Sequence, residues 1–78
     1  MKPVNVGICG LGTVGSGTFN VLQRNHHEIS ARTGRDIRVT HVGTRKGNPS
    51  CDLAGVKVES DIFAVARAPE VDIVVELI

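Results

Sequence analysis

The chain has 78 residues, of which 41% are hydrophobic, its formal net charge is +1 at pH 7, and it holds two Phe but no Trp or Tyr. This length allows at most one small domain with a marginal core, and the composition suits a globular α/β protein. Balanced charges give no field for nucleic acid or an anionic membrane, and the absence of Trp and Tyr removes the usual stacking platform for single strands.

The first predicted element is a strand at residues 4–9, where Val and Ile alternate with small or polar residues. We expect it in the middle of a doubly wound sheet, where Gly7 and Cys9 are small enough for a helix to pack closely. Cys9 precedes the next motif directly. We interpret it as a buried filler, the alternative being a thiol beside a ligand.

A G-x-G-x-x-G motif follows this strand and is formed by Gly10, Leu11, Gly12, Thr13, Val14 and Gly15. Between a strand and a helix, the first glycine permits a tight turn, the second lets a pyrophosphate approach, and the third brings the helix close to the sheet. The N–H groups of the first helical turn would face the phosphates, supported by the helix dipole. The motif predicts a dinucleotide site, the alternative being a glycine-rich turn without a ligand.

One continuous helix of about 20 residues is predicted from Thr13 to Ala31 or Arg32, and Gly34 is its stop signal. His26 and His27 are adjacent and cannot share a helix face, so we interpret them as solvated residues rather than metal ligands. The spacing of apolar residues predicts one mostly apolar face, made of Val14, Thr18, Val21, Leu22, Asn25 and Ile29.

The second strand is predicted at residues 37–42, and the residues after it bear on which nucleotide binds: Gly43, Thr44, Arg45 and Lys46. An NAD-specific site usually has Asp or Glu at the end of this strand, about 20 residues past the glycines. Asp36 fits that count but stands at the start of the strand, on the far side of the sheet. Arg45 and Lys46 could bind a 2′-phosphate, so we predict NADP with NAD tolerated, the alternative being two solvated loop cations.

Residues 46–55 are predicted to be a loop, followed by a short strand at 56–58 and a helix closed by Pro69. Ser60 would cap this helix, with Asp61 in its first turn. The apolar face of the helix would be formed by Ile62, Phe63, Val65 and Ala66. The fourth strand covers residues 71–78, and right-handed crossovers place it beside the first strand, opposite the second. Within it, Glu76 either anchors a neighbouring loop or marks where the strand leaves the sheet.

This order predicts an α/β fold, the N-terminal half of a doubly wound (Rossmann-type) parallel sheet truncated after the fourth strand. Residues 1–78 would form a partial NAD(P)-binding domain, with the substrate and dimerisation domain absent, so the chain alone should be inactive and poorly soluble or partly disordered. We predict no catalytic residue, because His41 lies within the second strand, remote from the expected nicotinamide.

Cys9 and Cys51 form neither a C-x-x-C motif nor a metal-ligand spacing. We therefore expect a reduced, cytoplasmic protein with two free thiols and no metal site. The N-terminus carries no signal-peptide core, and the apolar runs are far shorter than the ~20 residues of a membrane span.

Residues 6–15, followed by Gly17 and Thr18, resemble the N-terminus of homoserine dehydrogenases, and so does the segment from residue 61 to residue 78. The resemblance implies NAD(P)-dependent interconversion of L-homoserine and L-aspartate 4-semialdehyde, in threonine and methionine biosynthesis, by a homo-oligomeric parent enzyme. Leu11, Thr13 and Val14 would then contact the pyrophosphate through their backbone, and residues 43–46 would meet the adenosine ribose. The family's catalytic residues would lie beyond Ile78.

Two alternatives to this family stay open. One is the nucleotide-binding half of another NAD(P)-dependent oxidoreductase, which residues after Ile78 would distinguish. The other is a non-catalytic nucleotide-sensing module. Such modules usually carry an acid after the second strand, where this chain has Arg45 and Lys46.

Overall fold

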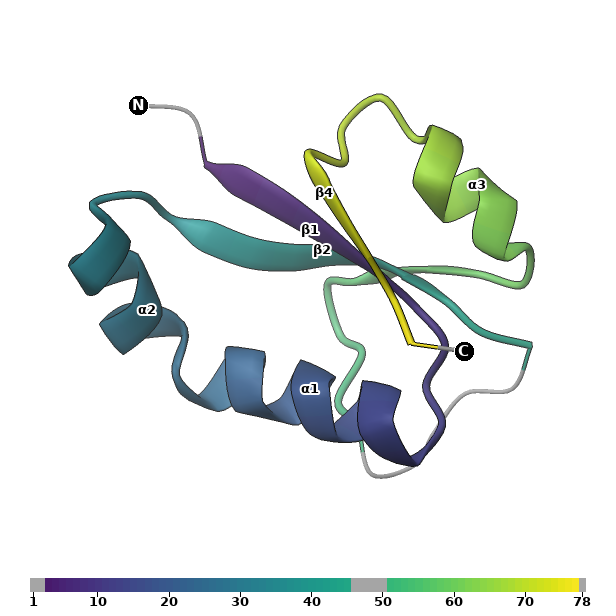
Figure 1. Ribbon diagram of the computed structural model, residues 1–78, viewed down its shortest axis with the longest axis horizontal. Coiled ribbons are helices and arrows are strands. Elements are labelled where there is room, and N and C mark those ends of the chain that lie inside the picture. The colour runs from purple at the N-terminus through teal and green to yellow at the C-terminus, as the bar shows by residue number, and fades with distance from the viewer. Residues whose placement is uncertain (1–2, 46–50, 78) are drawn as a thin grey trace.

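The computed structural model describes residues 3–45 and 51–77 (Figure 1). Within them, four strands form one parallel sheet in the order β3-β2-β1-β4. The strands are β1 (Val4–Cys9), β2 (Ile37–Gly43), β3 (Lys57–Glu59) and β4 (Ile73–Glu76). Helices α1 (Thr13–Arg24) and α2 (His26–Thr33) lie on one side of the sheet, and α3 (Ile62–Arg67) lies on the other (Figure 1).

The strand order confirms the predicted doubly wound α/β arrangement. β1 is central, with β2 on one side and β4 on the other, as right-handed crossovers require. Because all four strands are parallel, their carboxyl ends meet at one edge of the sheet. Residues that follow β1, β2 and β3 therefore come together there, although they are far apart in the sequence.

The single long helix predicted from Thr13 is wrong, because two helices meet at Asn25. Asn25 has φ −102° and ψ 15°, outside helical values, and asparagine is a weak helix former. His26 Nε2 lies 2.7 Å from Asp36 Oδ1, a contact that holds the start of α2 against the start of β2. Gly34 has φ 72° and ends α2 in the left-handed conformation, as predicted.

The buried face of α1 also differs from the predicted one. Val14 and Val21 are 65% and 43% exposed, whereas Phe19 is 1% exposed and packs in the core with Ile8 and Val42. Gly15 and Ser16 share this buried face. The close contact of Gly15 with the Gly10 backbone turns this face inward and leaves the two valines in solvent.

The second half of the chain differs from prediction in smaller ways. Asp61, not Ser60, is the N-cap of α3, and its carboxylate accepts the N–H of Phe63 at 2.9 Å. Phe63 and Ala66 are exposed, so α3 packs mainly through Val65, which lies over Gly7 and Gly43. The strands also start or end at other residues than predicted: β2 reaches Gly43, β3 is one residue later, and β4 is shorter.

In the part of the chain that the structure describes, every helix is too short or too polar to cross a membrane.

Candidate functional site

The three glycines of the G-x-G-x-x-G motif occupy three different environments. Gly10 has φ 99°, a left-handed value that favours glycine, and its N–H donates to the Gly43 carbonyl oxygen at 2.7 Å. A Cβ on Gly15 would lie 1.9 Å from the Gly10 carbonyl oxygen, so only glycine lets α1 approach this closely. A Cβ on Gly12 would meet nothing within 4 Å. Gly10 and Gly15 are thus required by the fold, whereas the fold places no such demand on Gly12.

The start of α1 has the features of a phosphate site. Gly12 is its N-cap and has no side chain with which to cap the first turn. The first N–H groups of an α-helix lack partners within the helix, and the helix dipole makes this end positive. Gly12, Thr13 and Val14 are exposed, so an anion can approach these backbone groups. Leu11 differs, because its side chain is buried in the core.

A cavity of about 520 Å³ lies at the carboxyl edge of the sheet, beside the motif. Its volume is within the range of small-molecule pockets. It brings together four of the residues predicted to bind the cofactor, Gly10, Gly43, Thr44 and Arg45, and adds Ser60 and Asp61 of the β3–α3 turn and Ile62 and Phe63 of the first turn of α3. Lys46, also predicted to bind the cofactor, lies outside the described residues.

Gly43 has a packing role that the sequence did not indicate. A Cβ there would lie 3.1 Å from Ile62 Cα and 3.1 Å from a methyl group of Val65. Its carbonyl oxygen accepts the N–H of Gly10. Gly43 therefore joins the glycine turn, β2 and α3 at the base of the cavity.

The turn after β3 supplies groups that sequence analysis did not assign to the site. A ribose-binding acid is expected after β2, but parallel topology brings residues after β3 to the same edge. Asp61 contributes a carboxylate whose Oδ2 lies 3.6 Å from Arg67 Nη2. The cavity is therefore lined by a cation, Arg45, a carboxylate, Asp61, and an aromatic residue, Phe63.

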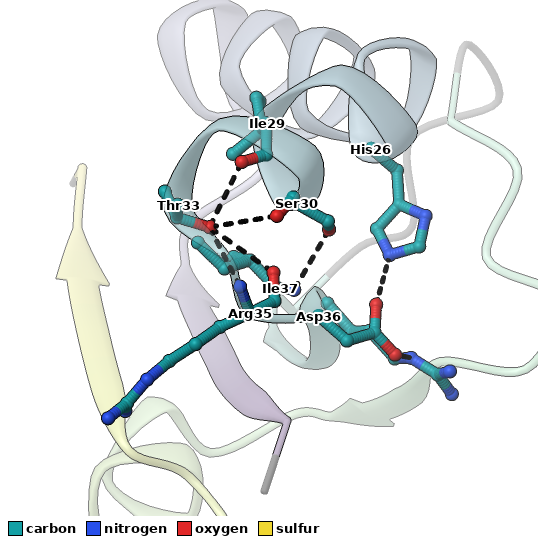
Figure 2. A network of polar contacts seen from close by, with 8 residues as sticks. His26, Ile29, Ser30, Thr33, Arg35, Asp36 and Ile37 are labelled. Atoms are coloured by element: carbon teal, nitrogen blue, oxygen red, sulfur yellow. Dashed lines mark hydrogen bonds and ion pairs between the residues drawn. The ribbon is translucent and has the colours of Figure 1, made fainter. Parts of the chain in front are cut away.

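Asp36 lies at the opposite end of β2, as predicted, and takes part in a separate polar network (Figure 2). Its carboxylate contacts His26 of α2 and Arg38 of β2. Desolvation alone would raise the pKa of Asp36, but the hydrogen bonds from His26 and Arg38 outweigh it and hold that pKa below its ordinary value. This carboxylate ties α2 to the sheet and is remote from the glycine turn.

Both cysteines are free, as predicted, and both are buried, although burial was predicted only for Cys9. The Cys9 thiol donates to the Ile62 carbonyl oxygen at 3.6 Å, which joins β1 to α3. Burial, followed by the negative charge of Glu76, raises the pKa of Cys9 above its ordinary value, so the thiol stays protonated at neutral pH. Cys9 is therefore a packing residue. Glu76 lies beside it in register on β4 and is exposed.

Among residues 3–45 and 51–77, no cluster of three or more His, Cys, Asp or Glu could hold a metal ion. His41 is buried, with Nδ1 at 2.8 Å from Thr40 Oγ1 and Nε2 at 3.5 Å from Glu70 Oε2. The contact with Glu70 links β2 to the turn before β4.

Comparison with known proteins identifies one family. Residues 10–77 match the family model described as homoserine dehydrogenase, NAD binding domain. The chain is 60% identical to homoserine dehydrogenase of Pseudomonas aeruginosa and 49% identical to that of Methylobacillus glycogenes, in both cases over its whole length. It spans only 18% and 19% of the length of these relatives.

Solved structures agree with the sequence matches. The structure superposes on a homoserine dehydrogenase from Thiobacillus denitrificans with a TM-score of 0.82 at 49% identity, covering 100% of this chain and 18% of that one. An S. aureus homoserine dehydrogenase gives a TM-score of 0.81 at 30% identity, covering 97% of this chain and 20% of that one. The chain therefore belongs to the homoserine dehydrogenase family, in which it matches the NAD-binding domain.

Proposed function

We propose that the protein to which this chain belongs interconverts L-homoserine and L-aspartate 4-semialdehyde, with this chain supplying the dinucleotide site. The observation that carries the proposal is the open space at Gly12, where the fold leaves room beside the first turn of α1. When bound, the nicotinamide dinucleotide donates or accepts a hydride. The residues of this chain hold the cofactor, and substrate recognition belongs to the remainder of the enzyme.

In this proposal the residues of the site divide into two groups. The backbone N–H groups of the G-x-G-x-x-G turn, Gly10–Gly15, hold the pyrophosphate at the positive end of α1. Gly43, Thr44, Arg45 and Lys46 meet the adenosine ribose. The homo-oligomeric state, the cytoplasmic location and the place in threonine and methionine biosynthesis belong to the same proposal.

The activity is tested on the purified protein to which this chain belongs. L-homoserine and oxidised cofactor are added, and the reduced cofactor that forms is followed by its absorbance. The Gly12→Ala variant is the matched probe, because its added methyl group meets no protein atom and should leave folding intact. We expect turnover in the wild type and weakened cofactor binding in the variant. No turnover in either direction with wild-type protein would contradict the proposed reaction.

We also propose that NADP is preferred over NAD. Arg45 is exposed and lines the cavity, where its guanidinium can pair with a 2′-phosphate in the bidentate manner that suits arginine. Asp36, which fits the position of a ribose-binding acid by counting, is engaged with His26 and Arg38 at the other end of β2.

Titration of NADPH and NADH into the Arg45→Ala variant tests this preference. We expect NADPH affinity to fall by about tenfold, the worth of one charge-assisted hydrogen bond, with little change for NADH. Arg35→Ala is the control, because Arg35 is an exposed arginine that lines a different cavity. An unchanged NADPH preference in Arg45→Ala would show that the arginine does not select the cofactor.

A further inference from the structure

Phe63 is an exposed aromatic residue beside the proposed cofactor site. The chain has two Phe residues, and their environments differ sharply. Phe19 is 1% exposed in the core, whereas Phe63 is 63% exposed on α3 and lines the 520 Å³ cavity. α3 packs on the sheet through Val65 instead. The fold therefore leaves the phenyl ring of Phe63 available to the contents of the cavity.

Asp61 places a hydrogen-bond acceptor in the same cavity. Its Oδ1 accepts the Phe63 N–H at 2.9 Å, which fixes the carboxylate at the start of α3. Its Oδ2 lies 3.6 Å from Arg67, and the side chain is 56% exposed. An ionised carboxylate only accepts hydrogen bonds, so its partner in a ligand must be a donor. The β3–α3 turn and the first turn of α3 thus combine an acceptor at Asp61 with an aromatic face at Phe63.

Adenine has the chemistry that this turn fits, because it is a flat ring with an amino group as donor at its 6-position. The cavity also contains Gly10 of the dinucleotide turn, so the adenosine end of a dinucleotide held there lies within reach. We propose that the β3–α3 turn is the adenine subsite, in which Phe63 packs against the base and Asp61 accepts the 6-amino group. This inference rests on the proposed function, because it requires a dinucleotide at the Gly10–Gly15 turn.

The acceptor is tested with NADPH and its hypoxanthine analogue, in which a 6-oxo group replaces the 6-amino group and the adjacent N1 carries a proton. Binding is measured by titration calorimetry on the purified protein, without turnover. We expect the wild type to prefer NADPH by about tenfold, because the 6-oxo group faces a carboxylate and neither can donate. Asp61→Asn should lose most of this preference, since an amide can donate to the 6-oxo group.

Asn is as good an N-cap as Asp, so this substitution keeps the start of α3. An unchanged melting temperature confirms that the cap survives. If Asp61→Asn discriminates between the two probes as strongly as the wild type, the carboxylate does not accept a hydrogen bond from the base, and the inference is overturned.

The contact between Phe63 and the base is tested with adenosine 2′,5′-bisphosphate, which contains adenine but no nicotinamide. We expect Phe63→Ala to weaken its binding by about tenfold, the worth of one base–aromatic stack, while binding of nicotinamide mononucleotide is unchanged. Val58→Ala is the control, because Val58 is an exposed apolar residue on β3 that does not line the cavity.

The outcomes separate this inference from the proposed function. If Phe63→Ala binds the bisphosphate normally and only its melting temperature falls, protein rather than adenine covers the ring, and the subsite is refuted. If wild-type protein binds neither NADPH nor NADH, the proposed function itself fails. Wild-type binding of NADPH with normal binding by the Phe63 and Asp61 variants overturns the adenine subsite alone.

Discussion

At the scale of single residues, Gly15 is where the glycine turn and the sheet fit together most tightly. The distance of 1.9 Å between a Cβ at this position and the Gly10 carbonyl oxygen is far below any normal contact, and both partners are backbone. Relief would require the start of α1 to move away from β1. The residue thus couples the stability of the fold to the shape of the cofactor site.

We predict that Gly15→Ala destabilises the protein by about 1–3 kcal/mol, the usual cost of overpacking, and also weakens dinucleotide binding. Gly17→Ala is the control, because Gly17 lies in α1 with nothing within 4 Å of a Cβ, and alanine should stabilise the helix by about 0.5–1 kcal/mol. Urea unfolding measures both changes. Equal stability of the two variants would show that the start of α1 can move away from β1 at little cost in free energy.

Residue environments were predictable where local backbone determines them. The predicted tasks of Gly10 and Gly15 follow from a strand–turn–helix setting, and the structure shows the turn at Gly10 and the close approach at Gly15. The role of Gly12 in binding pyrophosphate stays a prediction. Asp61 and Phe63 could not be placed in this way, because their nearness to Gly10 arises from pairing of strands distant in sequence. Their positions follow from the sheet order, once residues after β3 are considered together with those after β2.

At the scale of elements, the break between α1 and α2 is tied to one polar network at the start of β2. His26 and Arg38 both contact Asp36, so the carboxylate links α2 to the strand (Figure 2). Nearby, the Ser30 hydroxyl accepts the Ile37 N–H at 3.1 Å. These contacts hold α2 at an angle to α1 (Figure 1). The chain after α2 therefore enters β2 at Ile37, where the strand begins.

The network predicts a specific acid dependence of stability. Asp36 has a lowered pKa in the folded protein, so its contribution is fully present above the unfolded pKa of about 3.9 and is lost as the pH falls through the folded value. We expect Asp36→Asn to lower the melting temperature at pH 6, and the difference from wild type to shrink below pH 4. A difference that stayed constant down to pH 2 would argue against this linkage.

The control for this network is Glu28→Gln. Glu28 pairs with Arg32 on the exposed side of α2, at 2.9 Å and four residues apart. Such a surface pair contributes at most about 0.5 kcal/mol. The variant should therefore melt close to wild type at pH 6, where Asp36→Asn does not.

The elements themselves were mostly predictable, and the errors have one physical origin. Apolar spacing located α1, but spacing alone fits several rotations of a helix about its axis. The tertiary contact at Gly15 selects the rotation that buries Phe19 and exposes Val14. The break at Asn25 likewise depends on a partner, Asp36, that belongs to the next strand.

At the scale of the whole molecule, residues 3–45 and 51–77 expose many apolar groups for their size. Among these described residues, the large exposed hydrophobic side chains are Val14, Val21, Val58, Phe63, Ile73 and Val74. Two of them belong to β4, which forms one edge of the described sheet. Unpaired edge strands with apolar side chains promote association between chains.

We predict that a polypeptide of residues 1–78 alone self-associates or melts without cooperativity. Size-exclusion chromatography and thermal melting test this directly. Ile73→Lys should reduce self-association because it charges the edge strand, whereas Val21→Lys, on α1, should do so less. A monomer that melts cooperatively would contradict the prediction.

The central position of β1 has a consequence for how the protein is made. β1 is synthesised before the other three described strands, yet the Asn5 N–H finds its acceptor in Asp72, 67 residues later. At about 5–20 residues per second, the ribosome needs roughly 3–13 s to make that stretch. Throughout this interval, β1 has no partner along the edge that β4 later occupies. The Gly10–Gly43 hydrogen bond needs only β1 and β2, so the nucleotide turn can take shape while synthesis of β4 is still under way.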